Sequence, residues 1–73
     1  MNLRENRVSI VEVKKEILES VKRGRNLTPS EIVRIVQNIF PSHSHYEIKF
    51  LVKEMQRENE LVNDIIYGGL RAA

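Results

Sequence analysis

Apolar residues recur at helical spacing in three stretches of the chain. The pattern predicts helices from about Ile10 to Arg23, from Pro29 to just before Pro41, and from about His45 to Glu58. Each stretch is followed by a residue that favours a stop, namely Gly24, Pro41 and Asn59. The positions expected in the core are Ile10, Val13, Ile17, Leu18, Val21, Ile32, Val33, Ile35, Val36, Ile39, Phe40, Ile48, Leu51, Val52 and Met55.

Three helix starts are marked by a hydroxyl residue three positions before a glutamate. The segments are Ser9–Glu12, Thr28–Glu31 and Ser44–Glu47. This spacing is the capping box, in which the hydroxyl and the carboxylate satisfy backbone N–H groups that the first helical turn leaves unpaired. The residues before the first box are mostly polar. Residues 1–8 are therefore predicted to form a flexible arm, and residues 9–73 a single domain.

The pattern changes from helical to alternating after the third helix. Residues 61–62 and 65–67 carry side chains that favour strands, and Gly68-Gly69 is a typical two-residue hairpin turn. In a second arrangement Asn63-Asp64 forms the turn and Gly68-Gly69 makes a further bend. The sequence leaves both arrangements open. Leu27, between the first two helices, is a candidate third strand.

Three segments carry a resemblance to a known class of domain. They are Glu16–Val21 in the first helix, Leu27–Val33 at the start of the second, and Leu51–Val62, where the third helix leads into a strand. Together with the order of elements they resemble the winged helix-turn-helix superfamily of DNA-binding domains, over residues 9–73. The resemblance implies a mainly α fold with a small β-hairpin as the wing. The turn Phe40–Ser44 is longer and more polar than the tightest turns of this kind, and the wing is expected to be short.

Composition excludes several classes of function. The chain has 73 residues, 41% hydrophobic and 30% charged, which fits one globular domain. It has no Cys, so disulfides and thiolate metal sites are excluded. No apolar run is long enough to cross a bilayer and the first residues lack the apolar segment of a signal peptide, so we expect a cytoplasmic protein that does not bind membranes.

Catalysis and cofactor binding have no support in the sequence. The chain contains two His and one Asp, and its glutamates fall mainly at helix starts or on polar faces. No Gly-rich loop precedes a helix. His43 and His45 form a close pair without a third ligand at a suitable spacing, so we expect no metal site. The protein is therefore expected to be neither an enzyme nor a cofactor carrier.

The distribution of charge points to nucleic acid more than the net charge of +2 does. On the third helix the basic residues and two aromatic residues fall on the side away from the core stripe, and the glutamates fall along another edge. A basic helix face presented in this way fits the major groove of DNA. The residues expected to contact DNA are Ser42, His43, Ser44, His45, Tyr46, Lys49, Lys53, Arg57 and, from the wing, Arg71.

Less specific readings of the same residues stay open. The basic strip can be an ordinary solvated face, and Lys22–Arg25 can simply complement the dipole of the first helix. Tyr46 and Phe50 can be a contact to a protein or to a second subunit.

From the basic face of the third helix we predict a small DNA-binding transcriptional regulator that uses residues 45–58 as its recognition helix and acts as a homodimer. The alternative is a winged-helix module for protein association, anchored by Tyr46 and Phe50.

Overall fold

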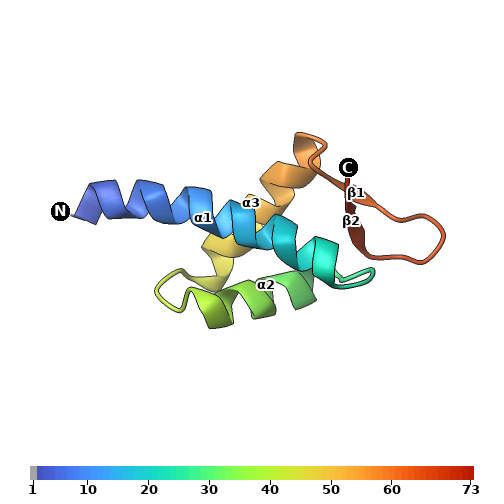
Figure 1. Cartoon of the computed structure of the whole chain (residues 1–73), viewed down its shortest axis with the longest axis horizontal. Coiled ribbons are helices and arrows are strands. Elements are labelled where there is room, and N and C mark those ends of the chain that lie inside the picture. The colour runs from blue at the N-terminus through green and yellow to red at the C-terminus, as the bar shows by residue number, and fades with distance from the viewer. Residues whose placement is uncertain (1) are drawn as a thin grey trace.

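The computed structural model describes the backbone of residues 2–73 and the side chains from Ile10 onward. Its elements are α1 (Asn2–Arg23), α2 (Pro29–Ile39), α3 (His45–Arg57), β1 (Leu61–Asn63) and β2 (Leu70–Ala72) (Figure 1). The strands pair antiparallel, with Leu61 opposite Ala72. This confirms the predicted fold of three helices followed by a small β-hairpin in a winged-helix layout. None of the described helices is long and apolar enough to cross a bilayer.

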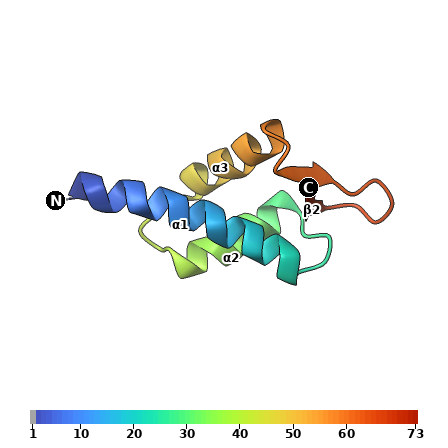
Figure 2. The ribbon, with the colours of Figure 1, turned by 45° about the horizontal axis from the view of Figure 1, so that its top comes forward.

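The first helix begins earlier than its sequence pattern predicts. It starts at Asn2, so the expected start at Ile10 is wrong, and Ser9 lies inside the helix instead of capping it. The segment predicted as an arm contains no Gly or Pro and is rich in residues that tolerate a helix, so nothing in it stops the backbone from continuing. Figures 1 and 2 show this end of α1 extending beyond the other elements.

The other two capping boxes are confirmed. The hydroxyl of Thr28 accepts from the backbone N–H of Glu31, and the Thr28 N–H donates to the Glu31 carboxylate at 2.9 Å. Ser44 and Glu47 make the same pair of bonds at the start of α3. Both helices therefore begin where the sequence predicts, because four local hydrogen bonds fix their first turns.

The core lies where the three helices and the hairpin meet. Its buried residues are Val13, Ile17, Val21, Ile32, Val33, Val36, Ile48, Val52, Met55, Leu61 and Leu70. Leu18, Leu27, Phe40 and Leu51 pack against them. The core prediction is wrong for Ile10 and Ile39, which lie near the outer ends of the packed regions and are 43% and 47% exposed. Ile35 is only half-buried and does not belong to the core cluster.

The hairpin differs from both arrangements considered from the sequence. Neither Gly68-Gly69 nor Asn63-Asp64 forms a two-residue turn, because a loop of residues 64–69 joins the strands. Ile65, Ile66 and Tyr67 belong to this loop and not to a strand. Leu27 does pair with the hairpin, as predicted: it forms an antiparallel bridge to Leu70, whose N–H donates to the Leu27 carbonyl at 2.8 Å.

The residues that follow α1 and α3 adopt different backbone conformations. Asn59 has a φ of 64°, as expected for the residue that terminates α3, and the N–H of Glu60 donates to the Met55 carbonyl. Gly24 follows the end of α1 as predicted, but the left-handed residue there is Asn26, with a φ of 57°. A Cβ on Gly24 would lie 2.7 Å from the outer atoms of the Leu27 side chain, so a larger residue there would require Leu27 to shift.

Candidate nucleic-acid interface

Two lysines stand on the outer face of α3. Lys49 and Lys53 are exposed, whereas the adjacent residues Ile48 and Val52 turn toward the core and are buried. None of the ion pairs among the side chains described, from residue 10 onward, involves either lysine. Since the inner face of α3 is fixed by packing, the helix directs two lysines outward that have no carboxylate partner among the described side chains.

Arg57 lies on the same outer face, but its positive charge is partly neutralised by a carboxylate. Its guanidinium is 3.8 Å from the carboxylate of Glu54, one turn earlier on α3, although the Arg57 side chain is largely exposed. Such an exposed pair contributes little stability and exchanges readily with solvent. The predicted separation of charges therefore holds at Lys49 and Lys53 and is weaker at the C-terminal end of α3.

His43 is engaged within the protein. Its ring packs edge-on against Phe40, and Nδ1 lies 3.4 Å from the Glu47 carboxylate, with the side chain 12% exposed. The Gln37 side chain also donates to the His43 carbonyl at 3.2 Å. These contacts fix the turn between α2 and α3, and they make His43 a support for the start of α3 more than a free donor.

The remaining predicted residues of this turn are exposed. Ser42 is at the surface, and Ser44 accepts the capping hydrogen bond while its own O–H is left to donate. The His45 ring packs edge-on against Tyr46, at 5.9 Å between centroids. His43 and His45 thus contact different aromatic residues and do not converge on one point.

Arg71, the predicted contact from the wing, is exposed on β2 opposite Val62. The loop beside it is organised by Asp64, whose Oδ1 accepts from the backbone N–H groups of Ile66 and Tyr67, both at 3.0 Å. The Tyr67 N–H, helped by Asn26, Ile66 and the charge of Arg71, holds the pKa of Asp64 below its ordinary value of 3.8.

Asn26 joins this loop to the connection between α1 and α2. Its side-chain amide donates to Asp64 Oδ2 at 3.1 Å and to the Gly68 carbonyl at 2.8 Å. Gly69 approaches the Asn26 backbone so closely that a Cβ there would lie 2.1 Å from the Asn26 carbonyl oxygen. The wing is therefore attached to the helical body at a defined place.

The tip of the wing is a surface that the sequence analysis did not identify. Ile65, Ile66 and Tyr67 are 94%, 81% and 77% exposed. Their side chains favour strands, so the sequence pattern predicts a strand at these positions. The signal that could have placed them in a loop is Asp64, since Asp commonly accepts hydrogen bonds from the backbone two residues on and starts a turn.

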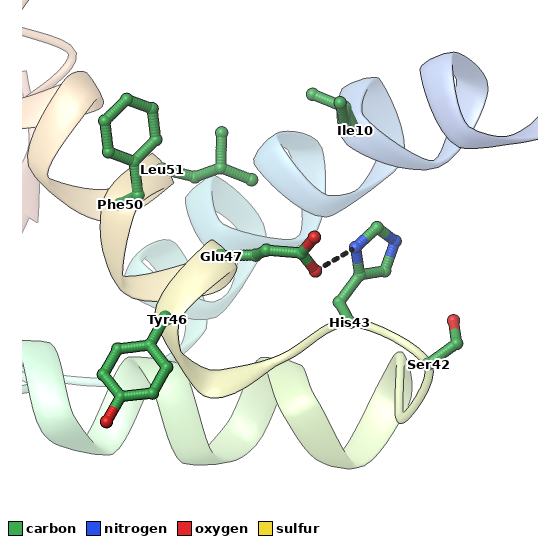
Figure 3. Close-up of a pocket in the computed structure, with 7 residues that line it drawn as sticks. All are labelled: Ile10, Ser42, His43, Tyr46, Glu47, Phe50 and Leu51. Carbon is green, nitrogen blue, oxygen red and sulfur yellow. Dashed lines mark ion pairs between the residues drawn. The ribbon is translucent and has the colours of Figure 1, made fainter. Parts of the chain in front are cut away.

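A second apolar surface lies between α1 and the start of α3. Its lining includes Ile10, Phe50 and Leu51, with Glu47 reaching across toward His43 (Figure 3). Tyr46 also borders this groove and is 79% exposed, and Phe50 is 59% exposed. Among the described residues, the groove is thus apolar at Ile10 on α1 and at Phe50 and Leu51 on α3, and its carboxylate lies 3.4 Å from the His43 imidazole.

Comparisons with known proteins find no matching family model, no similar curated protein and no similar solved structure. Three surfaces are therefore the basis for proposing a function: the lysine face of α3, the groove between α1 and α3, and the tip of the wing.

Proposed function

We propose that this protein is a cytoplasmic DNA-binding regulator of winged-helix type, in which α3 enters the major groove. The observation that supports this proposal most directly is the exposure of Lys49 and Lys53 without a carboxylate partner among the described side chains. Two ammonium groups spaced by one helical turn meet phosphates or guanine edges when a helix lies in the major groove. Arg57 and Arg71 add positive charge on α3 and on the wing.

Binding through these lysines is expected to be weak for one copy and strongly dependent on salt. Each phosphate neutralised on duplex DNA contributes about −0.9 to the slope of log affinity against log salt concentration. A single copy with two lysines and two arginines makes only a few such contacts. Two copies bound at neighbouring half-sites of one duplex would present two α3 helices and double these contacts, which is why the proposal includes a homodimer formed on DNA.

The test is a titration of random duplex DNA across a salt series. Lys49→Ala and Lys53→Ala should each weaken binding several-fold at low salt and reduce the salt slope by about 1. The matched control is Lys15→Ala, which removes an exposed lysine from α1. The proposal fails if the chain does not bind duplex DNA at low salt, or if Lys15→Ala weakens binding as much as the α3 variants do.

A second candidate function is protein association through Tyr46 and Phe50. The exposure of both rings on α3 supports it, because aromatic residues are enriched at the centres of protein interfaces. Phe50→Ala should then abolish a protein complex or a dimer while the affinity for DNA stays the same. Loss of DNA affinity without any change in association would contradict this candidate.

A further inference from the structure

The apolar wing tip is a prominent feature that DNA binding leaves unexplained. Ile65, Ile66 and Tyr67 are consecutive, and each is more than three-quarters exposed. Connecting loops are usually polar, and three adjacent large apolar side chains form a continuous patch instead of the isolated exposure that is normal on surfaces. The patch carries no charge of its own, so attraction to phosphates does not account for it.

The loop that carries these side chains is held in one conformation. Asp64 accepts from two backbone N–H groups of the loop, its own carbonyl accepts from Gly68, and its N–H donates to Gly69. Asn26 adds two hydrogen bonds from the body. A loop that is already ordered loses little conformational entropy when it binds, which favours a role as an inserted anchor.

The same chain offers a groove with matching chemistry. The groove between α1 and α3 is lined by Ile10, Phe50 and Leu51 and has a volume of about 690 Å³, within the roughly 300–1,000 Å³ of sites that hold small molecules. That volume has room for a few side chains. Among the described residues that line the groove, Glu47 supplies the one carboxylate, whose side chain is 63% exposed.

The charges near the two surfaces are opposite in sign. Arg71 is exposed on the wing behind the tip, and Glu47 is exposed at the groove. The carboxylate of Asp64, which would repel Glu47, is turned into its own loop by three hydrogen bonds. Complementary charge favours the correct orientation of the two surfaces more than it adds affinity.

The two surfaces lie at opposite ends of the molecule. Figures 1 and 2 both show the wing far from the start of α3, which lines the groove together with Ile10 of α1. We propose that the wing tip of one copy inserts into the α1–α3 groove of the next, so that copies of this chain associate head to tail. In such a heterologous contact, each associated pair still has one free wing tip and one free groove. Further copies can therefore bind to it.

The groove adjoins the lysine face of α3. Tyr46 and Phe50, which help to line the groove, lie within about 60° of Lys53 on a helix of 3.6 residues per turn. The inserted tip of a neighbour therefore lies beside the lysines. A contact made by three loop side chains is expected to be smaller than the roughly 800 Å² per partner of a standard interface, so the association should be weak and depend on concentration.

The experiment is sedimentation velocity of the purified chain from micromolar to millimolar concentration, without DNA. The wild-type chain should show an average mass that rises steadily with concentration beyond twice the monomer mass. Ile66→Glu at the tip and Phe50→Glu in the groove should each lose this rise and stay monomeric. The matched control is Ile39→Glu, since Ile39 is exposed at the end of α2 outside both surfaces, and this variant should associate like the wild type.

Mixing the two variants gives the decisive result. The Ile66→Glu chain keeps an intact groove and the Phe50→Glu chain keeps an intact tip, so an equimolar mixture should form a pair of twice the monomer mass that grows no further. The proposal is overturned if the wild type stays monomeric, if it forms a closed dimer of fixed mass, or if the mixture stays monomeric. Circular dichroism of each variant tests whether the fold is kept. Because the sedimentation experiment contains no DNA, its result does not depend on whether Lys49 and Lys53 bind DNA.

Discussion

The helical body and the wing of this protein are stabilised by different interactions. In the body, side chains such as Ile17, Ile32 and Ile48 are fully buried, and apolar contact holds the three helices together. In the wing, Leu61 and Leu70 belong to the core, but residues 64–69 are held by hydrogen bonds from Asp64 and Asn26.

The comparison shows that apolar side chains have opposite roles in the two regions. In the body they are buried and supply the stability of the fold. In the loop of the wing, Ile65 to Tyr67 contribute almost nothing to stability, because they are exposed and polar groups set the conformation. Apolar residues that the fold does not need are available for contact with another molecule.

The largest expected effect separates the two roles directly. Ile48→Ala removes a fully buried side chain from α3 and should lower the free energy of unfolding by about 2–5 kcal/mol. Ile66→Ala, at the exposed tip, should change it by less than about 0.5 kcal/mol. Urea unfolding followed by circular dichroism, at concentrations too low for association, measures both. A cost for Ile66→Ala similar to that of Ile48→Ala would show that the tip is packed in solution.

The same contrast explains which parts of the fold could be predicted from the sequence. The starts of α2 and α3 depend on residues three positions apart, so the capping boxes identify both. Burial of Ile32 and Ile48 follows from helical spacing alone. The early start of α1 was missed because the box at Ser9 is compatible with a continuing helix, and a cap signature does not by itself interrupt one.

The wing could be predicted only in part, because distant residues decide its shape. Asn26 bonds to Asp64 and Gly68, which lie 38 and 42 positions further along the chain. No local pattern contains that information, so two local turn types were considered and neither occurs. For the candidate interface, the outward direction of Lys49 and Lys53 follows from spacing. The burial of His43 against Phe40 depends on the packing of the turn and was not predictable.

The second prediction concerns the attachment of the wing to the body. Gly69→Ala places a Cβ 2.1 Å from the Asn26 carbonyl oxygen, at a φ of +75°, so the backbone must move. We expect a loss of stability greater than the roughly 1–2 kcal/mol that a left-handed conformation costs an ordinary residue, together with faster hydrogen exchange at the Leu70 N–H.

Gly68→Ala is the matched control for this prediction. Gly68 has a similar φ of +80°, but nothing lies within 4 Å of the added Cβ, so only the conformational cost remains. Equal losses in the two variants would contradict the view that close approach to Asn26 fixes the wing.

The smallest expected effect tests the hydrogen bonds of the wing through pH. The N–H of Tyr67 and its neighbours favour the ionised form of Asp64, so the pKa in the folded protein lies below 3.8. A group with a lowered pKa stabilises the folded state fully above its unfolded value, and this contribution is lost as the pH falls through the folded pKa. The wing should therefore loosen under acid conditions, below pH 3.8, before any comparable change at Ile48.

Amide chemical shifts measured across an acid titration give this result residue by residue. The N–H resonances of Ile66 and Tyr67 should titrate with a shared midpoint below 3.8. Asp64→Asn keeps an oxygen acceptor but cannot ionise, so it should retain the loop and lose that midpoint. A midpoint at or above 3.8 in the wild type would mean that these N–H groups do not stabilise the carboxylate, and the rigid presentation of the wing tip would then lose its physical basis.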